Sequence, residues 1–595
     1  MLTKKLTFAL WSCLRIMGTV LMIQFPGEMV SRRTVPMITQ DSLLLRDYQF
    51  VRQSDPWLTH HNAAALTRFA VDNIVEAEAS LTKGNGGLVN FDDSRNTLQG
   101  NVRTESFYRL SPSVVTFGAI SYDNWTGRDM TGSAFMLQRT PFDLVEDSLN
   151  NPGRKHRDTY RLVGGVGVDI YKGVSLGARI DYTSANYAKY KDLRHKNKLM
   201  DLQLTLGTYI PVLPWLNVGA DYTYRRQTES VDFGTYGKSE RVYKTLIDYG
   251  AFMGRVEQFG NEGFTDKARE MPLFEDRHGA GLQLELCPQS AICSPSLREG
   301  RGRLSFFAAL DFSHATGYYG RRSPYTITYT NHDRDILNLQ SRITYAIRTS
   351  RFTLDVNYSA EELNNRAETF REMTNAGGAN YYEYYDPVET GTKTWYDLSV
   401  ELHALLGNSS FSLRECGEAN FILNSSFLPA WDLSAGYFRN ERRQSAYLFP
   451  YYRHQQLTTH TFSICATRNV LTRQGVWSFT LNAAYQKGAG DPYCDGTFTP
   501  QSSALSPQTS DFSPLTSDLL HLPSSMDAFL WREYQYLVAP QYTLGARVKY
   551  AFIFPGTRLK THARLGIDYR KATETYDYSL GDQHTQLSLA LGCTF

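Results

Sequence analysis

Hydrophobic and polar residues alternate along much of the chain from about residue 72 onward. In VSLGARIDYT (174–183), every second residue is apolar or aromatic, and the residues between them are small or polar. The same period recurs in WLNVGADYTY (215–224), VWSFTLNAAY (476–485) and THARLGIDYR (561–570). A period of two predicts strands with one apolar and one polar face. About ten residues is also the length of a tilted strand that crosses a bilayer.

The connections between these segments differ in length. Short turns occur at YKG (171–173), RTS (348–350) and FPG (554–556). Long polar segments alternate with them, at roughly 126–157, 228–278, 360–393 and 488–533. Short periplasmic turns and long extracellular loops are typical of outer-membrane barrels. Counting the alternating segments predicts an all-β, transmembrane antiparallel β-barrel of about 18 strands, with a range of 16–20.

Aromatic residues recur at corresponding positions of the predicted strands. Six of them end the apolar face of strands that run toward the long loops: Tyr182, Tyr222, Phe312, Tyr358, Tyr485 and Tyr569. Aromatic residues at both borders of an apolar band form the interfacial girdle of membrane barrels. A general preference of tyrosine for strands would place it at any depth, so the repeated positions favour a girdle.

The last segment, QLSLALGCTF (586–595), has an apolar face that includes Leu587, Leu589, Leu591 and Phe595. Small residues occupy the other face. This pattern predicts the closing strand of the barrel, with its apolar face toward lipid. We expect the terminal aromatic residue to be recognised by the barrel assembly machinery.

Composition adds two limits. The net charge of +2 and the 21% of charged residues give no reason to expect a nucleic-acid partner. After the first 25 residues, no apolar run approaches the length of a membrane-spanning helix. We therefore expect the partners of the chain to be outer-membrane lipid and other proteins of that membrane.

The amino-terminal residues predict an export signal. Lys4 and Lys5 precede an apolar stretch, and residues 1–39 are expected to be a signal peptide whose cleavage site is not defined. Residues 40–71 are expected to be either a periplasmic lead-in or a hatch inside the lumen. Residues 72–595 are expected to form the outer-membrane barrel.

The predicted inner face carries charged residues: Arg179, Asp181, Asp221, Arg225, Arg564 and Asp568. Charged side chains inside a barrel require water or partners of opposite charge. One interpretation is an ion-pair network that stiffens the wall. The other is a lumen lined for the passage of a polar solute.

Two predicted outer loops are rich in tyrosine. The residues concerned are Tyr381, Tyr382, Tyr384, Tyr385, Tyr451 and Tyr452. Exposed aromatic rings can stack on sugars, on planar cofactor-like rings or on a partner protein. They can equally extend the aromatic girdle.

Catalytic, cofactor and metal sites are not predicted. His278 and His332 each have neighbouring carboxylates, but side chains adjacent along a strand point apart. No C-x-x-C pair and no cluster of histidine and cysteine has the spacing of a zinc site. The sequence therefore predicts a protein that is not an enzyme.

Three segments carry a resemblance: SDPWLTHHNAAAL (54–66), SYDNWTGRDMTGSAF (121–135) and DYTSANYAKYKDLRHKNKL (181–199). They resemble an outer-membrane barrel family of Bacteroidota that is known only as a domain of unknown function. The resemblance implies a location in the outer membrane of a Gram-negative bacterium and assigns no functional residues. It also implies a role near TonB-linked uptake, with a TonB-linked receptor or a surface lipoprotein as partner.

A second resemblance concerns NAAAL (62–66), which is similar to the Asn-Pro-Ala stretch in the hatch of long-chain fatty-acid channels. Ala63 stands where that family has proline. Together these features predict a transport or uptake component, either a channel or an accessory to a nutrient receptor. The alternative is a surface-exposed interaction or secretion-accessory barrel with a closed lumen.

Overall fold

The structure is a computed structural model, and it describes residues 48, 55–69, 73–146, 152–236, 242–259, 271–287, 303–323, 326–347, 350–378, 380–407, 429–472, 475–498, 524–554, 559–574 and 578–595. The predicted signal peptide, residues 1–39, lies outside these residues. Among the residues described, no helix is long and apolar enough to cross a membrane.

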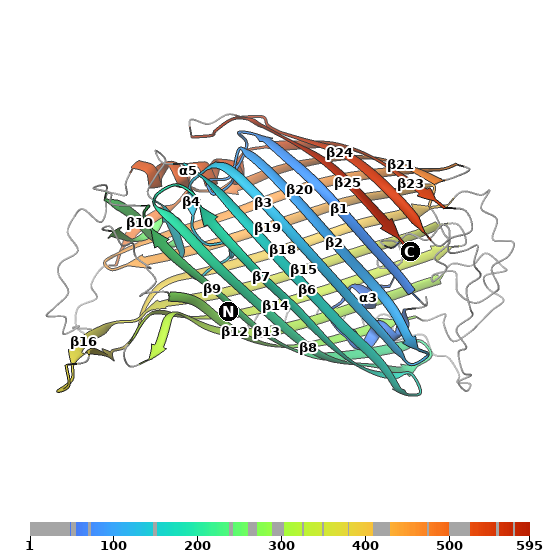
Figure 1. The fold of residues 1–595 in the computed structure, drawn as a ribbon, viewed down its shortest axis with the longest axis horizontal. Coiled ribbons are helices and arrows are strands. Elements are labelled where there is room, and N and C mark those ends of the chain that lie inside the picture. Colours follow the sequence, from blue (N-terminus) through green and yellow to red (C-terminus); the bar gives the residue numbers. More distant parts are fainter. Residues whose placement is uncertain are drawn as a thin grey trace. The chain divides into compact units, whose positions relative to one another are not determined.

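The described strands form a closed 18-strand antiparallel barrel, which confirms the predicted fold class (Figure 1). Consecutive barrel strands pair with each other around the wall. In chain order they are β1 (Asn73–Gly86), β2 (Asn96–Ser111), β3 (Val114–Met130), β6 (Gly153–Tyr171), β7 (Val174–Lys189), β8 (Arg194–Leu213), β9 (Leu216–Gly234), β12 (Met271–Leu286), β13 (Arg303–Ser323), β14 (Thr326–Ile347), β15 (Ser350–Ala367), β18 (Val388–Leu406), β19 (Trp431–Leu448), β20 (Tyr451–Leu471), β21 (Gly475–Gly490), β23 (Gln541–Ile553), β24 (Lys560–Ala572) and β25 (Gln583–Thr594).

Pairing of the first strand with the last closes the barrel. The β1–β25 ladder runs from Glu76 opposite Thr594 to Gly86 opposite His584. On β25, Leu587, Leu589 and Leu591 are exposed on the outer face, as the alternation in the sequence predicted. Closure removes the unpaired strand edges that an open sheet would leave exposed.

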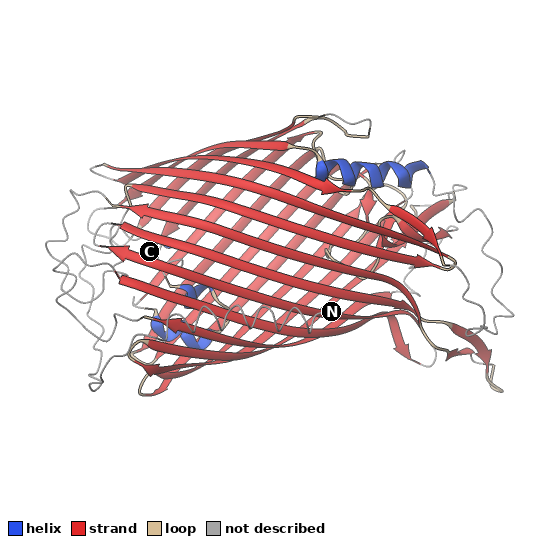
Figure 2. Ribbon diagram, turned by 180° about the vertical axis from the view of Figure 1, so that it is seen from behind, coloured by secondary structure: helices blue, strands red, loops and turns tan. Residues whose placement is uncertain are grey.

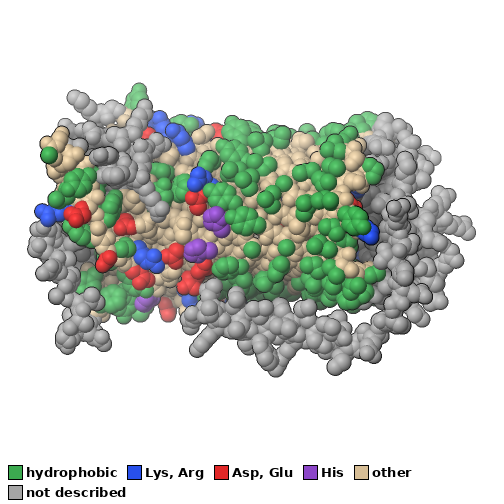
Figure 3. Space-filling model, turned by 90° about the horizontal axis from the view of Figure 1, so that it is seen from below, with side chains coloured by type: hydrophobic (Ala, Val, Ile, Leu, Met, Phe, Trp, Pro, Cys, Tyr) green, Lys and Arg blue, Asp and Glu red, His purple; other side chains and the backbone are tan. Residues whose placement is uncertain are grey.

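Large apolar side chains cover the outside of the barrel in a broad band (Figure 3). Leu206, Leu481 and Leu565, each more than 60% exposed, belong to this band. Charged side chains gather beside the band on the side of the long outer connections. An apolar band on the outer surface is the surface expected of a barrel embedded in lipid.

The six residues predicted for the aromatic girdle all lie on the outer face. Tyr222, Phe312 and Tyr485 are exposed, and the other three (Tyr182, Tyr358 and Tyr569) are half-buried. Tyr222 Oη lies 2.7 Å from His278 Nδ1, so its polar end meets a polar neighbour while its ring adjoins the apolar band. This arrangement suits a position at a membrane–water boundary.

We call the end where β1 begins and β25 ends the inner end, and the opposite end the outer end. Short turns at the inner end include 172–173 and 214–215. Two longer connections, 287–302 and 407–430, also join strands at this end, and most of their residues are not among those that the structure describes. At the outer end, the strands extend beyond the apolar band, so the loops are shorter than predicted. For example, β9 continues to Gly234, because strand pairing requires hydrogen bonds but no apolar surface.

Several outer connections contain secondary structure of their own. One contributes β4 (Gly132–Ser133) and β5 (Asp143–Glu146), another β10 (Tyr243–Gly250) and β11 (Met253–Phe259), and a third the hairpin of β16 (Phe370–Thr374) and β17 (Asn380–Tyr384). The fourth contributes β22 (Cys494–Thr497) and helix α5 (Ser524–Val538).

Helix α5 corrects the sequence interpretation, which treated 488–533 as one polar loop. Phe529 and Leu530 of α5 are fully buried, and this apolar contact stabilises a helix at the end of a segment rich in Pro, Ser and Thr.

Candidate functional site

A short segment before the first strand lies inside the barrel, and we call residues 55–69 the plug segment (Figure 2). It contains helix α3 (Pro56–Thr59) and the 3-10 helix η2 (Ala63–Arg68). The Asp55 carboxylate accepts a hydrogen bond from the Trp57 N–H, and the Asn62 side-chain oxygen accepts one from the Ala64 N–H. These caps satisfy backbone donors at the start of each helix, so two very short helices can form.

A row of glycines on the inner wall receives the plug segment. Gly167 of β6, Gly177 of β7 and Gly207 of β8 lie opposite one another in consecutive ladders. A Cβ atom at Gly177 would lie 2.1 Å from the Ala64 nitrogen, so the contact requires glycine there. The alanines of NAAAL thus lie directly on the backbone of the wall.

Polar contacts fix the position of the plug segment. The Asn62 amide group donates to the Thr208 carbonyl at 3.0 Å and to Gln283 Oε1 at 2.9 Å. Arg68 forms ion pairs with Asp55 at 2.9 Å and with Glu285 at 3.0 Å. The plug segment is therefore held by side-chain contacts and adds no strand to the barrel sheet.

Trp57 anchors the plug segment to the wall. Its side chain is 1% exposed, and its ring packs edge-on against Tyr209 and Phe307, with centroid distances of 5.1 and 5.2 Å. Its Nε1–H donates to Glu285 Oε2 at 3.0 Å. A buried indole with its N–H satisfied contributes both apolar burial and orientation.

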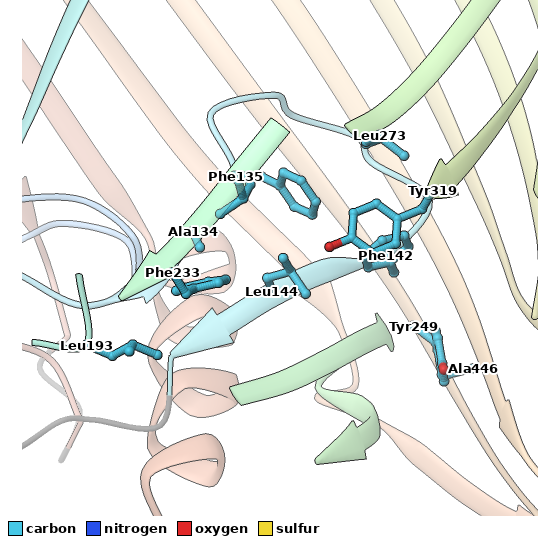
Figure 4. Close-up of a cluster of buried hydrophobic side chains, with 11 residues drawn as sticks. Ala134, Phe135, Phe142, Leu144, Leu193, Phe233, Tyr249, Leu273, Tyr319 and Ala446 are labelled. Carbon is cyan, nitrogen blue, oxygen red and sulfur yellow. The ribbon is translucent and has the colours of Figure 1, made fainter. Parts of the chain in front are cut away.

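At the outer end, two connections fold into the lumen, and we call residues 131–146 and 242–259 the lid. Strands β4, β5, β10 and β11 of the lid form a four-stranded sheet that is separate from the barrel sheet. Leu144 of β5 packs in one buried cluster with Phe142 and with Tyr319 of the wall (Figure 4). Val145, the next residue, packs in a second buried cluster that includes Phe529 of α5. The lid thus has an apolar core on both faces of its sheet.

Wall side chains also satisfy polar groups of the lid backbone. Glu229 accepts hydrogen bonds from the Met136 and Leu137 N–H groups at 2.8 and 2.9 Å. Lys393 donates to the Thr140 carbonyl at 3.1 Å, and Gln444 accepts from the Ala251 N–H at 3.0 Å. These contacts compensate backbone groups that the small sheet leaves unpaired in a buried region.

A buried charge cluster joins the lid to strands β6 and β7. Glu146 Oε1 lies 3.0 Å from Lys155 Nζ, and Glu146 Oε2 binds Lys189 Nζ. Burial raises the pKa of Glu146, but the two lysines outweigh that effect and lower it to about 2. Burial, together with Lys155, lowers the pKa of His195 to about 3, so this histidine is neutral. Glu146 is therefore the anion that compensates two buried ammonium groups.

A polar hollow of about 440 Å³ lies beside the plug segment. Eleven of its fourteen lining residues have hydrophilic side chains, namely Thr59, His60, His61, Arg179, Asp311, Asn338, Gln340, Asn357, Ser359, Asp397 and Ser399, and the other three are Leu339, Tyr358 and Phe438. Asp397 also binds Arg139 of the lid, with a distance of 2.7 Å. The hollow thus reaches from the plug segment to a residue that contacts the lid.

The charged residues predicted for the inner face lie in ion pairs and hydrogen bonds. Asp181 binds Arg161 at 2.6 Å and lies 3.7 Å from Arg179, and Arg225 binds Asp201 at 2.6 Å. The contacts of Asp181 with Arg161 and of Arg225 with Asp201 are cross-strand pairs along the wall, whereas Arg179 and Asp181 lie on the same strand.

The other predicted residues of this face make similar contacts. Arg564 binds Glu78 at 3.0 Å across the seam of the barrel, and Asp568 lies 3.1 Å from Arg547. Asp221 is bound by His61 of the plug segment at 2.8 Å. Of the six predicted residues, Arg179 alone is in the lining of the polar hollow.

The predicted tyrosine positions belong to two separate elements. Tyr381, Tyr382 and Tyr384 lie on β17 with Tyr385 directly after it, and all of them except Tyr382 are exposed. Tyr451 and Tyr452, in contrast, begin barrel strand β20 and are half-buried. The structure does not bring the two groups into one cluster.

His60, His61 and Asp311 also lie in the lumen, although the alternating pattern did not identify them. Each is placed there by contacts between segments far apart in the chain. The local sequence signal for this site was the pair of adjacent histidines before NAAAL. That segment was compatible with a periplasmic lead-in as well as with a hatch inside the lumen.

No curated protein matches this chain. Among solved structures, the outer membrane transporter YddB from Escherichia coli aligns with 9% identity and a TM-score of 0.38, over 88% of this chain and 81% of that one. The RagAB peptide transporter aligns with 7% identity and a TM-score of 0.37, over 90% and 89% of the two chains.

A family model described as a family of unknown function, DUF6850, matches residues 63–595. The match begins inside the plug segment and covers every strand of the barrel. Because it spans far more than half of the chain, this protein belongs to the DUF6850 family.

Proposed function

We propose that the protein is an outer-membrane transport component, in which the plug segment and the lid control a polar lumen. The observation that carries this proposal is the polar hollow beside the plug segment, which reaches Asp397, the ion-pair partner of Arg139 in the lid. Its lining includes neutral hydrogen-bond donors and acceptors as well as charged side chains of both signs, which suits a small polar solute. An 18-strand barrel is also wide enough to hold an aqueous path when its interior is not filled.

The way in which both parts are held supports a gating role. Neither the plug segment nor the lid sheet pairs with a barrel strand, so each could move without breaking the wall. Their contacts are side-chain hydrogen bonds, ion pairs and apolar packing. Elements attached in this way have lower local stability than the sheet that surrounds them.

Ion conductance in planar bilayers tests the proposal. We expect a variant without residues 41–71 to carry several-fold more current than the intact protein. Gly177→Val is expected to act in the same direction, because a side chain there meets the backbone of Ala64. Gly118→Val is the matched control, since its nearest side-chain contact would be an ordinary 3.4 Å. The transport proposal is abandoned if the plug deletion, combined with a lid-destabilising substitution, still carries no current.

The proposed membrane location predicts a large effect of charge on the outer face. Leu481 lies midway along β21 and is 66% exposed. Leu481→Arg is expected to destabilise the barrel by about 2–4 kcal/mol, as for a cation at the centre of a bilayer. Urea unfolding in lipid vesicles measures this, with Tyr385→Arg on the exposed hairpin as control. Equal stability of the two variants would contradict a lipid-facing position for Leu481.

A second candidate function is surface interaction by a barrel with a closed lumen. The buried apolar core of the lid favours it, because such a core stabilises a closed outer end. The exposed Tyr381, Tyr384 and Tyr385 of the hairpin would then contact a partner. Co-purification of one stoichiometric protein, lost when residues 370–385 are deleted, would favour this function over transport.

The predicted partners and source remain part of the proposal. A TonB-linked receptor or surface lipoprotein is the expected partner, and the outer membrane of a Gram-negative bacterium of the Bacteroidota is the expected location. The likeness of NAAAL to the hatch of fatty-acid channels stays a prediction.

A further inference from the structure

Two histidines of the plug segment meet two aspartates of the wall. His60 and His61 precede η2, Asp221 lies on β9 and Asp311 lies on β13. His60 Nε2 is 3.6 Å from Asp311 Oδ2, and His61 Nε2 is 2.8 Å from Asp221 Oδ1 and 3.6 Å from Asp311 Oδ1. One ligand atom from each of His60, His61 and Asp311 can be chosen so that all lie within 4.8 Å of one another.

The three nitrogen–oxygen distances of 2.8, 3.6 and 3.6 Å lie close to the edges of a metal coordination shell. Zinc binds imidazole nitrogen and carboxylate oxygen at about 2.0–2.2 Å, so neighbouring ligand atoms lie about 2.9–3.5 Å apart. Two nitrogen and two oxygen ligands suit a divalent first-row transition metal better than magnesium or calcium, which prefer oxygen alone.

The surroundings allow the two carboxylates to converge. A Cβ atom at Gly281 would lie 2.3 Å from Asp311 Oδ1 and 2.7 Å from Asp221 Oδ2, so only glycine leaves both oxygens in place. Asp311 Oδ1 is buried and accepts no hydrogen bond among the described residues. An oxygen in this state has a lone pair available for a cation.

Other polar side chains orient the cluster. Gln283 donates to Asp221 Oδ2 at 2.5 Å, and its own Oε1 accepts from the Asn62 amide group at 2.9 Å. Hydrogen bonds of this kind hold ligating carboxylates in position in metal sites. The same Asn62 caps η2, so the geometry of the cluster depends on the docked plug segment.

We propose that His60, His61, Asp221 and Asp311 bind one divalent transition-metal ion of the zinc class, which joins the plug segment to the wall. His60, His61 and Asp311 also line the polar hollow, so a further coordination position can face it. His60 is the weakest ligand, because its Nδ1 accepts a 3.3 Å hydrogen bond from the Asn62 N–H that ligation through Nε2 disrupts. This inference goes beyond the proposed transport function and holds even if the barrel conducts no ions.

Cobalt(II) titration of the full-length, tag-free protein in detergent tests the site. We expect one ion per chain, a visible absorption band, displacement by zinc and no displacement by magnesium or calcium. Asp311→Asn and His61→Ala each alter a proposed ligand and are expected to weaken binding by at least about 100-fold, since even the loss of a contact that supports a ligand costs about 10–100-fold. His403→Ala is the matched control, since His403 Nε2 also lies 2.5 Å from an aspartate, Asp432, on another part of the wall.

A second measurement uses the unmodified protein, in case a variant fails to fold. Zinc is expected to protect the partly exposed His61 from acylation by diethyl pyrocarbonate, measured by mass spectrometry, while the exposed His314 reacts as before. Protection without conductance in any variant would support the metal site and contradict the transport proposal. The metal site is overturned if cobalt does not bind saturably, or if zinc leaves the acylation rate of His61 unchanged.

Discussion

Glu146→Gln is expected to destabilise the lid by about 3–5 kcal/mol, because it leaves two buried lysines without their counter-ion. Lys155 is 0% exposed and Lys189 is 2% exposed, so water cannot replace the lost carboxylate. The lid is expected to open while the barrel remains folded, since the backbone of Glu146 pairs within the lid sheet and not with a barrel strand. Hydrogen exchange of the lid, compared with exchange of the barrel strands, measures the change.

The same cluster predicts a dependence on pH. The pKa of Glu146 is lowered from 4.5 to about 2, so the stabilisation from its charge is present above pH 4.5. That stabilisation is lost as the pH falls from about 4.5 toward 2. Protection of the lid amides, corrected for the intrinsic pH dependence of exchange, should therefore decrease with acid in the unmodified protein, and Glu146→Gln should lack this part of the profile.

Two further variants separate charge from packing. Glu383→Gln removes a carboxylate from the exposed hairpin and should leave the lid unchanged. Replacing the whole cluster with apolar residues, as in Glu146→Leu, Lys155→Met and Lys189→Met together, should restore much of the stability. If Glu146→Gln exchanges like the unmodified protein, the cluster does not hold the lid.

Trp57→Ala is expected to destabilise the docked plug segment by about 3–5 kcal/mol, the usual cost of removing a large buried aromatic side chain. The substitution removes the contacts with Tyr209 and Phe307 and leaves Glu285 without the indole donor. Limited proteolysis of the plug segment in the folded barrel measures this effect. We expect cleavage near residues 55–69 to become rapid while the barrel resists heat and detergent as before.

Leu58→Ala is a suitable comparison for Trp57→Ala. Leu58 is also buried in the plug segment, but it makes no side-chain hydrogen bond, so a smaller effect of about 2–3 kcal/mol is expected. If the Trp57 variant is cleaved no faster than this comparison, Glu285 and the aromatic contacts do not anchor the plug segment.

The sequence predicted the wall of the barrel well. Alternation in segments such as 174–183 and 476–485 separates an outer from an inner face. In lipid, such strands can satisfy every backbone hydrogen-bonding group only when the sheet closes into a barrel. The positions of Tyr222, Phe312 and Tyr485 at the end of the apolar face follow from the same local pattern. These features depend on residues next to each other in the chain, which is why the sequence contains them.

The contents of the lumen could not be predicted in this way. The glycines at 167, 177 and 207 were readable as small inner residues, but their alignment into one row depends on the register between three strands. Residues 40–71 were compatible with a lead-in as well as a hatch. Docking on the glycine row, which the structure shows for residues 55–69, depends on contacts such as Asn62 with Gln283, 221 residues apart.

The lid and the cluster around His61 depend on the tertiary structure to a still greater degree. Leu144, Phe233 and Tyr319 meet in one core, although each lies in a different connection or strand. They are too far apart in the sequence for any helical or strand periodicity to relate them. Sequence alone determined that this chain forms a barrel with an apolar outside, because that requirement acts on each strand separately. Only the tertiary structure decided what fills the barrel, because the segments that enter the lumen are selected by complementary shape and charge on distant strands.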